Sequence, residues 1–507
     1  MSLVNKIAVS LYAKRYKAMD YYRKHPDEVQ EKLFKNLIKT AAGTEFGKQY
    51  GFSSINNIAA YQSRVPIQEY DDIMPLIDRM RGGEQNILWP TPVKWFAKSS
   101  GTTGSKSKFI PITHESLNGC HFRGSRDVVL THIRQFSDSK LLLGKSLTLG
   151  GSHKIDDLNK SVKSGDLSAI LIQNAPFYAN IARVPKKETA LISDFETKLD
   201  RIAKETAKAN IVSFAGVPSW NLVLMRHILD YAGKSNLLEL WPNLELFMHG
   251  GISFGPYREQ FQEIIPSPKM RYRETYNASE GFFALQDDLT DPSMQLIMDT
   301  GMFYEFVPLS ELYTDNPTAY TVADVKTGVS YALIISTNSG LWRYVIGDTV
   351  EFTSLYPHKI KITGRTKHFI NVFGEELMVH NAEKALAATC DKTGAIVKEY
   401  TVAPIFMEEK SKGSHEWLVE FEREPKDLNQ FAEILDAELC SLNSDYEAKR
   451  AKSVTLNRLT LTPLPRNTFY EWMRQRGKLG GQNKVPRLFN TRQYADELLA
   501  ITADSDS

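Results

Sequence analysis

The period of hydrophobic and polar positions changes several times along the chain, and each change marks a different kind of element. Residues 1–43 follow a helical period, with Pro26 suited to the first turn of a second helix and Gly43 to its end. From residue 141 onward, short apolar runs alternate with helical segments, as in the run 210–215 and the helix expected over 219–232. This alternation predicts an α/β domain whose strands pair mostly in parallel.

Three further segments have clear periods of their own. Single helices are expected over 115–133 and 188–208, and a strand over 141–150. The helix over 115–133 would carry His121 and Arg123 on a polar face. Arg123 could reach a carboxylate or a phosphate, but an ordinary solvated face explains it equally simply.

The pattern changes again at residue 302, where β runs separated by turns continue to residue 363 and predict an antiparallel subdomain. A charged turn at 364–367 follows and is a candidate hinge. Residues 375–507 then have their own order of helix, strands, helix, strand and helix. We therefore predict a large domain over 1–364 and a smaller α+β domain over 365–507.

Composition excludes several classes of protein. The 507 residues are 42% hydrophobic and carry a formal net charge of +2, so nothing favours nucleic acid as a partner. Three widely spaced cysteines form no CxxC pair, which favours a reducing, cytoplasmic location. No apolar run approaches the ~18–20 residues that span a bilayer, so stable membrane insertion is not expected.

A run of hydroxyls and glycines after the β-prone stretch 93–97 is the strongest candidate for chemistry. Glycines let the backbone curl closely around a ligand, and a curled run of N–H groups binds anions. The spacing does not fit a Walker A loop, and a polar surface loop is the simpler alternative. A polyphosphate would suit its residues, which are Ser99, Ser100, Gly101, Thr102, Thr103, Gly104 and Lys108.

Further stretches fit a nucleotide site, although each alone is more often a turn, a core aromatic or a surface charge. Tyr276 offers a face for a base, Ser279 a hydroxyl for a phosphate, and Glu280 a carboxylate for Mg²⁺. Asp348 could accept hydrogen bonds from both ribose hydroxyls. The remaining candidates are the glycine turn Gly250-Gly251 after a predicted strand, Arg365, and the glycine-loop lysine Lys484.

One motif points elsewhere. Residues 251–255 match the G-x-S-x-G nucleophile elbow of hydrolases. A hydrolase would also need an acid and a histidine nearby, and nothing in the sequence brings them there. Because motifs of this length recur by chance, we do not favour a hydrolase.

The order of these motifs resembles the adenylate-forming superfamily of acyl ligases. The more specific resemblance is to the acyl-acid amido synthetases, the auxin-responsive family that also has bacterial members. It spans nearly the whole chain, through the stretches 44–47, 65–70, 99–113, 275–281, 303–308, 341–348 and 482–487. After residue 365 the chain departs from the plant synthetases and is closer to the general acyl-ligase hinge.

The resemblance implies a role for each matching residue. Ser99 to Thr103 would bind the phosphates of ATP. Tyr276 would lie by the adenine, Ser279 by phosphate, Glu280 on Mg²⁺ and Asp348 on the ribose. Lys484 would reach in from the small C-terminal domain, which would close over the large adenylate-forming domain.

The activity implied is a two-step ligation that uses ATP and Mg²⁺. A carboxylic acid is adenylated, and its acyl group is then transferred to an amine, expected to be that of an amino acid. Two alternatives remain open: an acyl-coenzyme A ligase of the same superfamily, and a non-catalytic nucleotide-binding or scaffold protein. The acid, the amine, the general base and the oligomeric state are not predicted. Acyl-pocket candidates, which are equally good core residues, are Phe214, Val217, Trp220 and Leu224.

Overall fold

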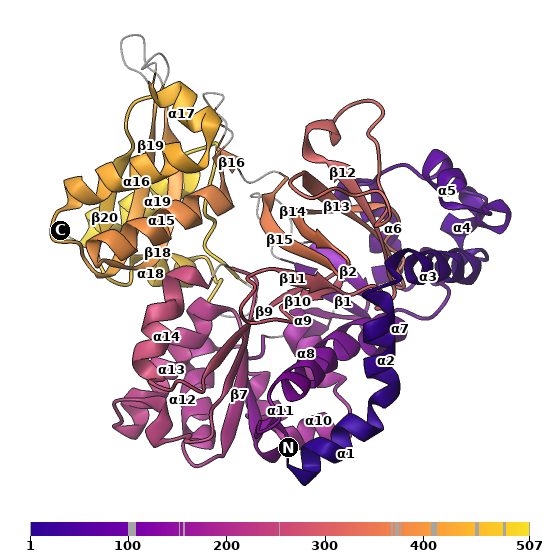
Figure 1. The fold of residues 1–507 in the computed structure, drawn as a ribbon, viewed down its shortest axis with the longest axis horizontal. Coiled ribbons are helices and arrows are strands. Elements are labelled where there is room, and N and C mark those ends of the chain that lie inside the picture. Colours follow the sequence, from indigo (N-terminus) through magenta and orange to yellow (C-terminus); the bar gives the residue numbers. More distant parts are fainter. Residues whose placement is uncertain are drawn as a thin grey trace. The chain divides into compact units, whose positions relative to one another are not determined.

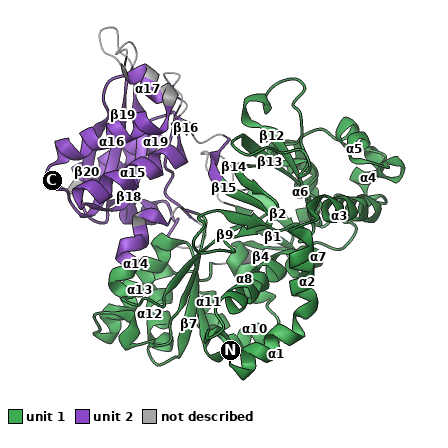
Figure 2. Cartoon of the chain, viewed as in Figure 1, with its two compact units in different colours: residues 1–251, 262–361 green, residues 252–261, 362–507 purple. Residues whose placement is uncertain are grey.

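The computed structural model divides into two compact units, coloured separately in Figure 2. Unit 1 comprises Met1–Gly251 and Gln262–Lys361, and unit 2 comprises Ile252–Phe261 and Ile362–Ser507. No pattern in the sequence indicates that 252–261 groups with the C-terminal unit, and the boundary at 364/365 stays a prediction. The structure describes residues 2–99, 108–151, 153–155, 158–252, 254–366, 369–370, 375, 377–406, 413–451, 456–479 and 483–505.

Unit 1 begins with helices. Pro26 opens α3, and Asp27 and Glu28 in its first turn complement the helix dipole. Phe34, Leu37 and Ile38 recur on one face of α3 and are buried in the core. No described helix is long and apolar enough to cross a membrane. The bounds here are α1 (Leu3–Leu11), α2 (Ala13–Tyr22), α3 (Pro26–Ala41), α4 (Glu45–Gln49), η1 (Phe52–Ser54), α5 (Ile58–Arg64) and α6 (Tyr70–Arg81).

The main sheet of unit 1 has 11 strands in the order β12-β13-β14-β15-β11-β10-β9-β8-β7-β3-β6. One part of it is parallel, as the alternating pattern predicted, because β6, β3, β7, β8 and β9 pair in parallel in that order. The bounds are β3 (Lys145–Thr148), β6 (Arg183–Val184), β7 (Ile211–Gly216), β8 (Leu246–His249) and β9 (Arg271–Ala278).

Helices cover both faces of this parallel part. Figure 1 shows α12 and α13 on one side of β7 and β9, and α8 on the other. Pro218 opens α13, which ends at Gly233 in the left-handed conformation. The helices are α7 (His114–Ser116), α8 (Phe122–Gln135), α9 (Leu167–Gln173), α10 (Phe177–Ala182), α11 (Lys187–Ala190), α12 (Phe195–Thr206), α13 (Pro218–Ala232) and η4 (Leu237–Glu239). α14 (Arg258–Ile264) begins in unit 2 and ends in unit 1.

The antiparallel runs predicted after residue 302 are also present, and they continue the same sheet. β12 pairs antiparallel with β13, and β13 with β14. Most residues of these strands are buried. Many of them pack in one core cluster with residues of the N-terminal helices. The bounds are β10 (Gly281–Leu285), β11 (Met294–Leu296), β12 (Met302–Pro308), η6 (Leu309–Glu311), β13 (Ser330–Thr337), β14 (Tyr344–Leu355) and β15 (His358–Arg365).

A separate sheet of four strands, ordered β2-β1-β5-β4, carries the flanks of the run 99–108. β1 pairs antiparallel with β2, and Ser99 lies opposite Lys108. The run therefore does not leave a strand of the main sheet, as the turns after β8 and β9 do. The bounds are β1 (Trp95–Ser99), β2 (Lys108–Ile112), β4 (His153–Ile155) and β5 (Lys163–Gly165).

Three predicted elements were too long. The helix expected over 115–133 is interrupted by a π-helical turn, η2 (Leu117–His121), before α8 begins. The helix expected over 188–208 is two helices, because Asp194 caps a new one by accepting a hydrogen bond from Thr197 N at 2.9 Å. The strand expected over 141–150 begins only after a short 3₁₀ turn, η3 (Leu141–Leu143).

Unit 2 has the predicted α+β pattern. β18 and β19 are antiparallel, and β20 adds to β19 in parallel. The core of this unit lies between these strands and α15 and α16. Its elements are η5 (Gly255–Tyr257), β16 (Phe369–Ile370), β17 (Leu377–Met378), α15 (Val379–Thr393), β18 (Ile396–Ile405), β19 (Ser414–Arg423), α16 (Leu428–Leu442), α17 (Ser444–Ala451), β20 (Thr460–Leu464), α18 (Thr468–Gln475) and α19 (Gln493–Ser505).

Candidate active site

The glycine turn after β8 packs directly against β9. A Cβ on Gly250 would lie 2.2 Å from the carbonyl oxygen of Thr275, so only glycine fits there. The Thr275 hydroxyl donates to the carbonyl of His249 at 3.1 Å. Gly251 has a φ of 86°, which a side chain would strain. The turn predicted to bind nucleotide therefore sits beside the residue that precedes Tyr276.

Two candidate ligand residues form the tip of the hairpin between β9 and β10. Ala278 pairs with Gly281, so Ser279 and Glu280 are its two turn residues. Turn residues usually face solvent, yet Ser279 is only 8% exposed and Glu280 only 6%. A Cβ on Gly281 would come 2.3 Å from the sulfur of Met302. The hairpin thus holds a hydroxyl and a carboxylate at a closely packed position.

The carboxylate of Glu280 has the chemistry of a Mg²⁺ ligand. Mg²⁺ prefers hard oxygen ligands and is commonly held by one or two carboxylates together with substrate phosphates. Among the described residues, no group of three or more His, Cys, Asp or Glu side chains forms a complete metal site. The metal role of Glu280 stays a prediction.

Tyr276 and Asp348 meet, although they are far apart in the sequence. The Tyr276 hydroxyl donates to Asp348 Oδ2 at 2.7 Å, and both residues are buried. The Tyr276 ring packs against Phe283, with 4.6 Å between centroids. β14 therefore brings the residue predicted for ribose to the residue predicted for adenine.

Lys108 lies between two tyrosines at the start of β2. Its ammonium is 3.5 Å from the Tyr344 hydroxyl and 5.6 Å from the centre of the Tyr70 ring. Tyr70 also accepts a hydrogen bond from Phe109 N at 2.8 Å. Tyr344 opens the strand that carries Asp348. The predicted phosphate residues Ser100, Gly101, Thr102, Thr103 and Gly104 lie outside the described residues.

The substrate candidates have contacts of an ordinary core. Arg123 donates to the carbonyl of Asp299 at 2.8 Å. Phe214 stacks on Phe247 at 4.2 Å, and the ring of Trp220 packs edge-on against Phe195 at 5.3 Å. Val217 precedes α13, and Leu224 is buried within it. Their substrate roles stay predictions to which these contacts add no support.

The prediction that His121 lies on a polar helix face is wrong. It is fully buried at the end of the π-helical turn rather than on a polar face. Burial lowers the pKa of His121 to about 4, although Asn277 on β9 acts in the opposite direction. The adjacent Cys120 sulfur accepts a hydrogen bond from Phe282 N at 3.1 Å. This turn therefore packs against the start of β10, next to the Ser279-Glu280 hairpin. No local sequence pattern predicts that contact.

The two remaining candidates belong to unit 2. Arg365 is the last residue of β15 and is partly exposed. Lys484 is partly buried, in a segment where Thr401 on β18 donates to the Pro486 carbonyl at 2.7 Å.

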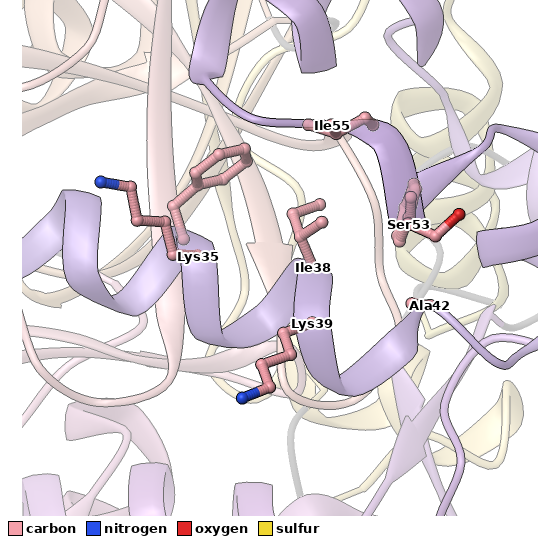
Figure 3. Close-up of a pocket in the computed structure, with 8 residues that line it drawn as sticks. Lys35, Ile38, Lys39, Ala42, Ser53 and Ile55 are labelled. Atoms are coloured by element: carbon pink, nitrogen blue, oxygen red, sulfur yellow. The ribbon is translucent and has the colours of Figure 1, made fainter.

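Two cavities of unit 1 lie elsewhere, along α3. One of about 220 Å³ lies between α3 and the η1 region, where the ammonium groups of Lys35 and Lys39 point away from Ser53 and Ile55 (Figure 3). The other, of about 810 Å³, is lined by residues of α2 and α3 and by Asp299. None of the predicted site residues lines either cavity.

Three regions of the chain match models of known protein domains. The model of the GH3 family N-terminal domain matches residues 15–270, that of the central domain 295–365, and that of the C-terminal domain 380–493. The chain belongs to the GH3 family. The resemblance inferred from the motifs is therefore confirmed.

Individual relatives of this GH3 protein have low sequence identity to it, but the similarity covers most of both chains. An indole-3-acetic acid-amido synthetase, GH3.3 of Arabidopsis thaliana, is 24% identical over 91% of this chain and 89% of its own. The GH3.15 acyl acid amido synthetase structure superposes with a TM-score of 0.79 at 16% identity, covering 96% of this chain and 95% of that one. A 2-hydroxyisobutyryl-CoA ligase superposes with a TM-score of 0.61 at 11% identity, covering 95% and 94%. The predicted α/β fold with a large N-terminal and a smaller C-terminal domain is thereby confirmed.

Proposed function

We propose that this GH3 protein is an ATP-dependent acyl-acid amido synthetase. A carboxylate oxygen attacks the α-phosphorus of ATP and pyrophosphate leaves. An amine nitrogen, that of an amino acid, then attacks the acyl carbon. AMP leaves with one of the original carboxylate oxygens, and the nitrogen loses a proton.

The observation that carries the proposal is the convergence of predicted nucleotide residues around β9. The strand supplies Tyr276, which bonds Asp348 at 2.7 Å, and leads into the buried Ser279-Glu280 tip. Gly250 packs against the same strand. Family membership over three matched domains supports assigning this cluster to a nucleotide.

Each residue has a task in this proposal. Tyr276 and Asp348 hold the adenosine, and the run from Ser99 to Gly104, with Lys108, binds the phosphates. Glu280 holds Mg²⁺, which neutralises charge that develops on the phosphates. Lys484 reduces the repulsion between the negative carboxylate and the negative α-phosphate as they approach each other. Arg365 reaches ribose or phosphate.

The test is ATP–pyrophosphate exchange over a panel of aryl, indolyl and aliphatic acids. The acid with the fastest exchange is then incubated with each amino acid, or with coenzyme A, and products are identified by mass. We expect exchange that requires Mg²⁺ and an amide product. A thioester as the sole product would make the protein an acyl-coenzyme A ligase. Absence of exchange with every acid would favour a non-catalytic nucleotide-binding protein.

A further inference from the structure

The segment that carries Lys484 is fixed to β18 by its backbone. Val402 N donates to the Arg487 carbonyl at 2.8 Å, and Phe489 N donates to the Val402 carbonyl at 3.1 Å. Thr401 holds the Pro486 carbonyl at 2.7 Å. The residues after Lys484 therefore lie beside β18 and pair with it at one isolated parallel bridge, between Val402 and Leu488.

Arg487 is the side chain that anchors this segment. It is only 9% exposed, and its guanidinium donates to the Glu399 carboxylate and, at 2.9 Å, to the Tyr400 carbonyl. The guanidinium carbon also lies 4.5 Å from the centre of the Tyr400 ring. A guanidinium is planar, and Arg487 contacts a carboxylate, a carbonyl and a ring at once, so these contacts together set its orientation as well as its distance from Glu399.

A tyrosine from a distant part of the chain completes the cluster. Tyr257, in η5, is 2% exposed. Its hydroxyl accepts from Arg487 at 3.3 Å and donates to Glu399 Oε1 at 3.3 Å. Each of the three side chains therefore contacts the other two. This cluster also explains why the segment 252–261 groups with unit 2.

A buried ion pair is weak evidence for stability, because desolvation offsets its attraction. What such a cluster supplies is a fixed geometry. Three residues of extended chain reach about 10 Å at most, and Pro486 restricts the path further. Fixing Arg487 therefore limits where Lys484 can lie.

We propose that Tyr257, Glu399 and Arg487 form a positioning cluster for Lys484. This inference rests on the proposed function, in which Lys484 acts in adenylation. The cluster should matter for making the acyl-adenylate. It should not matter for aminolysis, where the carboxylate charge has already been removed.

Unit 2 offers a matched control with the same three residue types. Tyr446 donates to Asp436 at 2.8 Å, and Arg450 Nε donates to the same carboxylate at 2.9 Å. This second cluster joins α16 and α17 rather than the Lys484 segment. Disturbing it changes stability by the same kind of chemistry without touching the Lys484 anchor.

The experiment compares Glu399→Gln and Tyr257→Phe with Asp436→Asn and Tyr446→Phe in the full chain. Pyrophosphate exchange, aminolysis of chemically prepared acyl-adenylate, and Tm are measured with the acid that exchanges fastest. For Glu399→Gln we expect kcat for exchange to fall about tenfold to a hundredfold, the scale of a small misplacement. KM for ATP should stay within about twofold because other residues hold the adenosine and the phosphates, and aminolysis should stay within about twofold because it does not use Lys484. Tyr257→Phe should give a smaller loss of the same kind, and both controls should keep both half-reactions.

Two results would overturn the inference. Equal loss of both half-reactions in Glu399→Gln, or unchanged exchange in both Glu399→Gln and Tyr257→Phe, would make the cluster purely structural. Lys484→Ala tests the underlying function separately. If Lys484→Ala loses exchange while the cluster variants keep it, the positioning role alone fails; if it keeps exchange, the role of Lys484 fails and the inference with it.

Discussion

Glu305 and Asp348 are buried carboxylates on strands of the same sheet, and different groups face them. Glu305, on β12, bonds the Arg343 guanidinium, with Arg343 Nη2 at 3.0 Å from Oε1. Gln62 adds a hydrogen bond at 2.9 Å. Asp348, on β14, accepts a hydrogen bond from the neutral Tyr276 hydroxyl. A bond from a neutral phenol costs less to exchange for a ligand than a buried ion pair does.

Glu305 is thus part of an ion pair that holds two elements of the fold together, whereas Asp348 is the carboxylate that we propose for ribose. Arg343 also donates to the Val65 carbonyl at 2.7 Å, so its pair with Glu305 ties β12 to the loop after α5. It does so from a left-handed backbone conformation with a φ of 45°, which is unusual for arginine.

The largest effect should come from Glu305→Gln, which leaves the Arg343 guanidinium buried without its carboxylate. We expect a loss of about 3–5 kcal/mol in the free energy of unfolding, measured by urea denaturation. Turnover per folded molecule should not change. The control is Glu31→Gln in the exposed pair with Lys35, where less than about 1 kcal/mol should be lost. Similar losses in both variants would contradict the structural role of Glu305.

His121 represents a third arrangement, a buried group kept neutral. Its pKa of about 4 lies below the ordinary 6.5, so the unfolded chain binds the proton more tightly than the folded protein. The stability term is fully present above about pH 6.5 and is lost as pH falls toward about pH 4, amounting to about 3 kcal/mol. Urea denaturation at about pH 7 and about pH 4.5 should show a smaller loss in His121→Gln than in the wild type. An equal loss would mean that His121 is not held neutral.

Asp348→Asn should reduce nucleotide binding with little effect on stability, because the asparagine oxygen can still accept from Tyr276. Loss of a charged acceptor for ribose should weaken ATP and AMP alike, by about tenfold to a hundredfold. Calorimetry with the two ligands measures this. An effect confined to ATP would place Asp348 by phosphate or metal instead.

The smallest effect should come from Tyr276→Phe, which keeps the ring beside Phe283 and removes only the hydroxyl. The free energy of unfolding should fall by about 1 kcal/mol, and AMP affinity should change by less than about threefold. If AMP binding falls as far as in Asp348→Asn, the hydroxyl and the carboxylate act as one unit, and the contrast with Glu305 narrows.

Local sequence patterns were sufficient to predict elements whose starts are marked by nearby residues. Pro26 and the acids after it mark the start of α3, and Pro218 marks the start of α13. The β runs after residue 302 appear as β12 to β15. The π-helical turn before α8 was missed because its residues fit an ordinary helix equally well.

Contacts between residues far apart in the chain could not be predicted from the sequence. Tyr276 and Asp348 were predicted as separate nucleotide residues, but their hydrogen bond spans 72 positions. Tyr257 follows the G-x-S-x-G motif and was given no role of its own, and its partners Glu399 and Arg487 lie 142 and 230 positions away. Such pairings depend on how strands are ordered in the sheet, which hydrophobic periodicity does not encode.

The most direct test of the account follows the oxygen atoms of the acid. The acid that exchanges fastest is labelled in both carboxylate oxygens with a heavy isotope and converted with ATP and an amino acid. An acyl-adenylate route predicts one heavy oxygen in the released AMP and one in the amide, as measured by mass spectrometry. Label in inorganic phosphate with none in AMP would show activation through an acyl phosphate and would contradict the proposed chemistry.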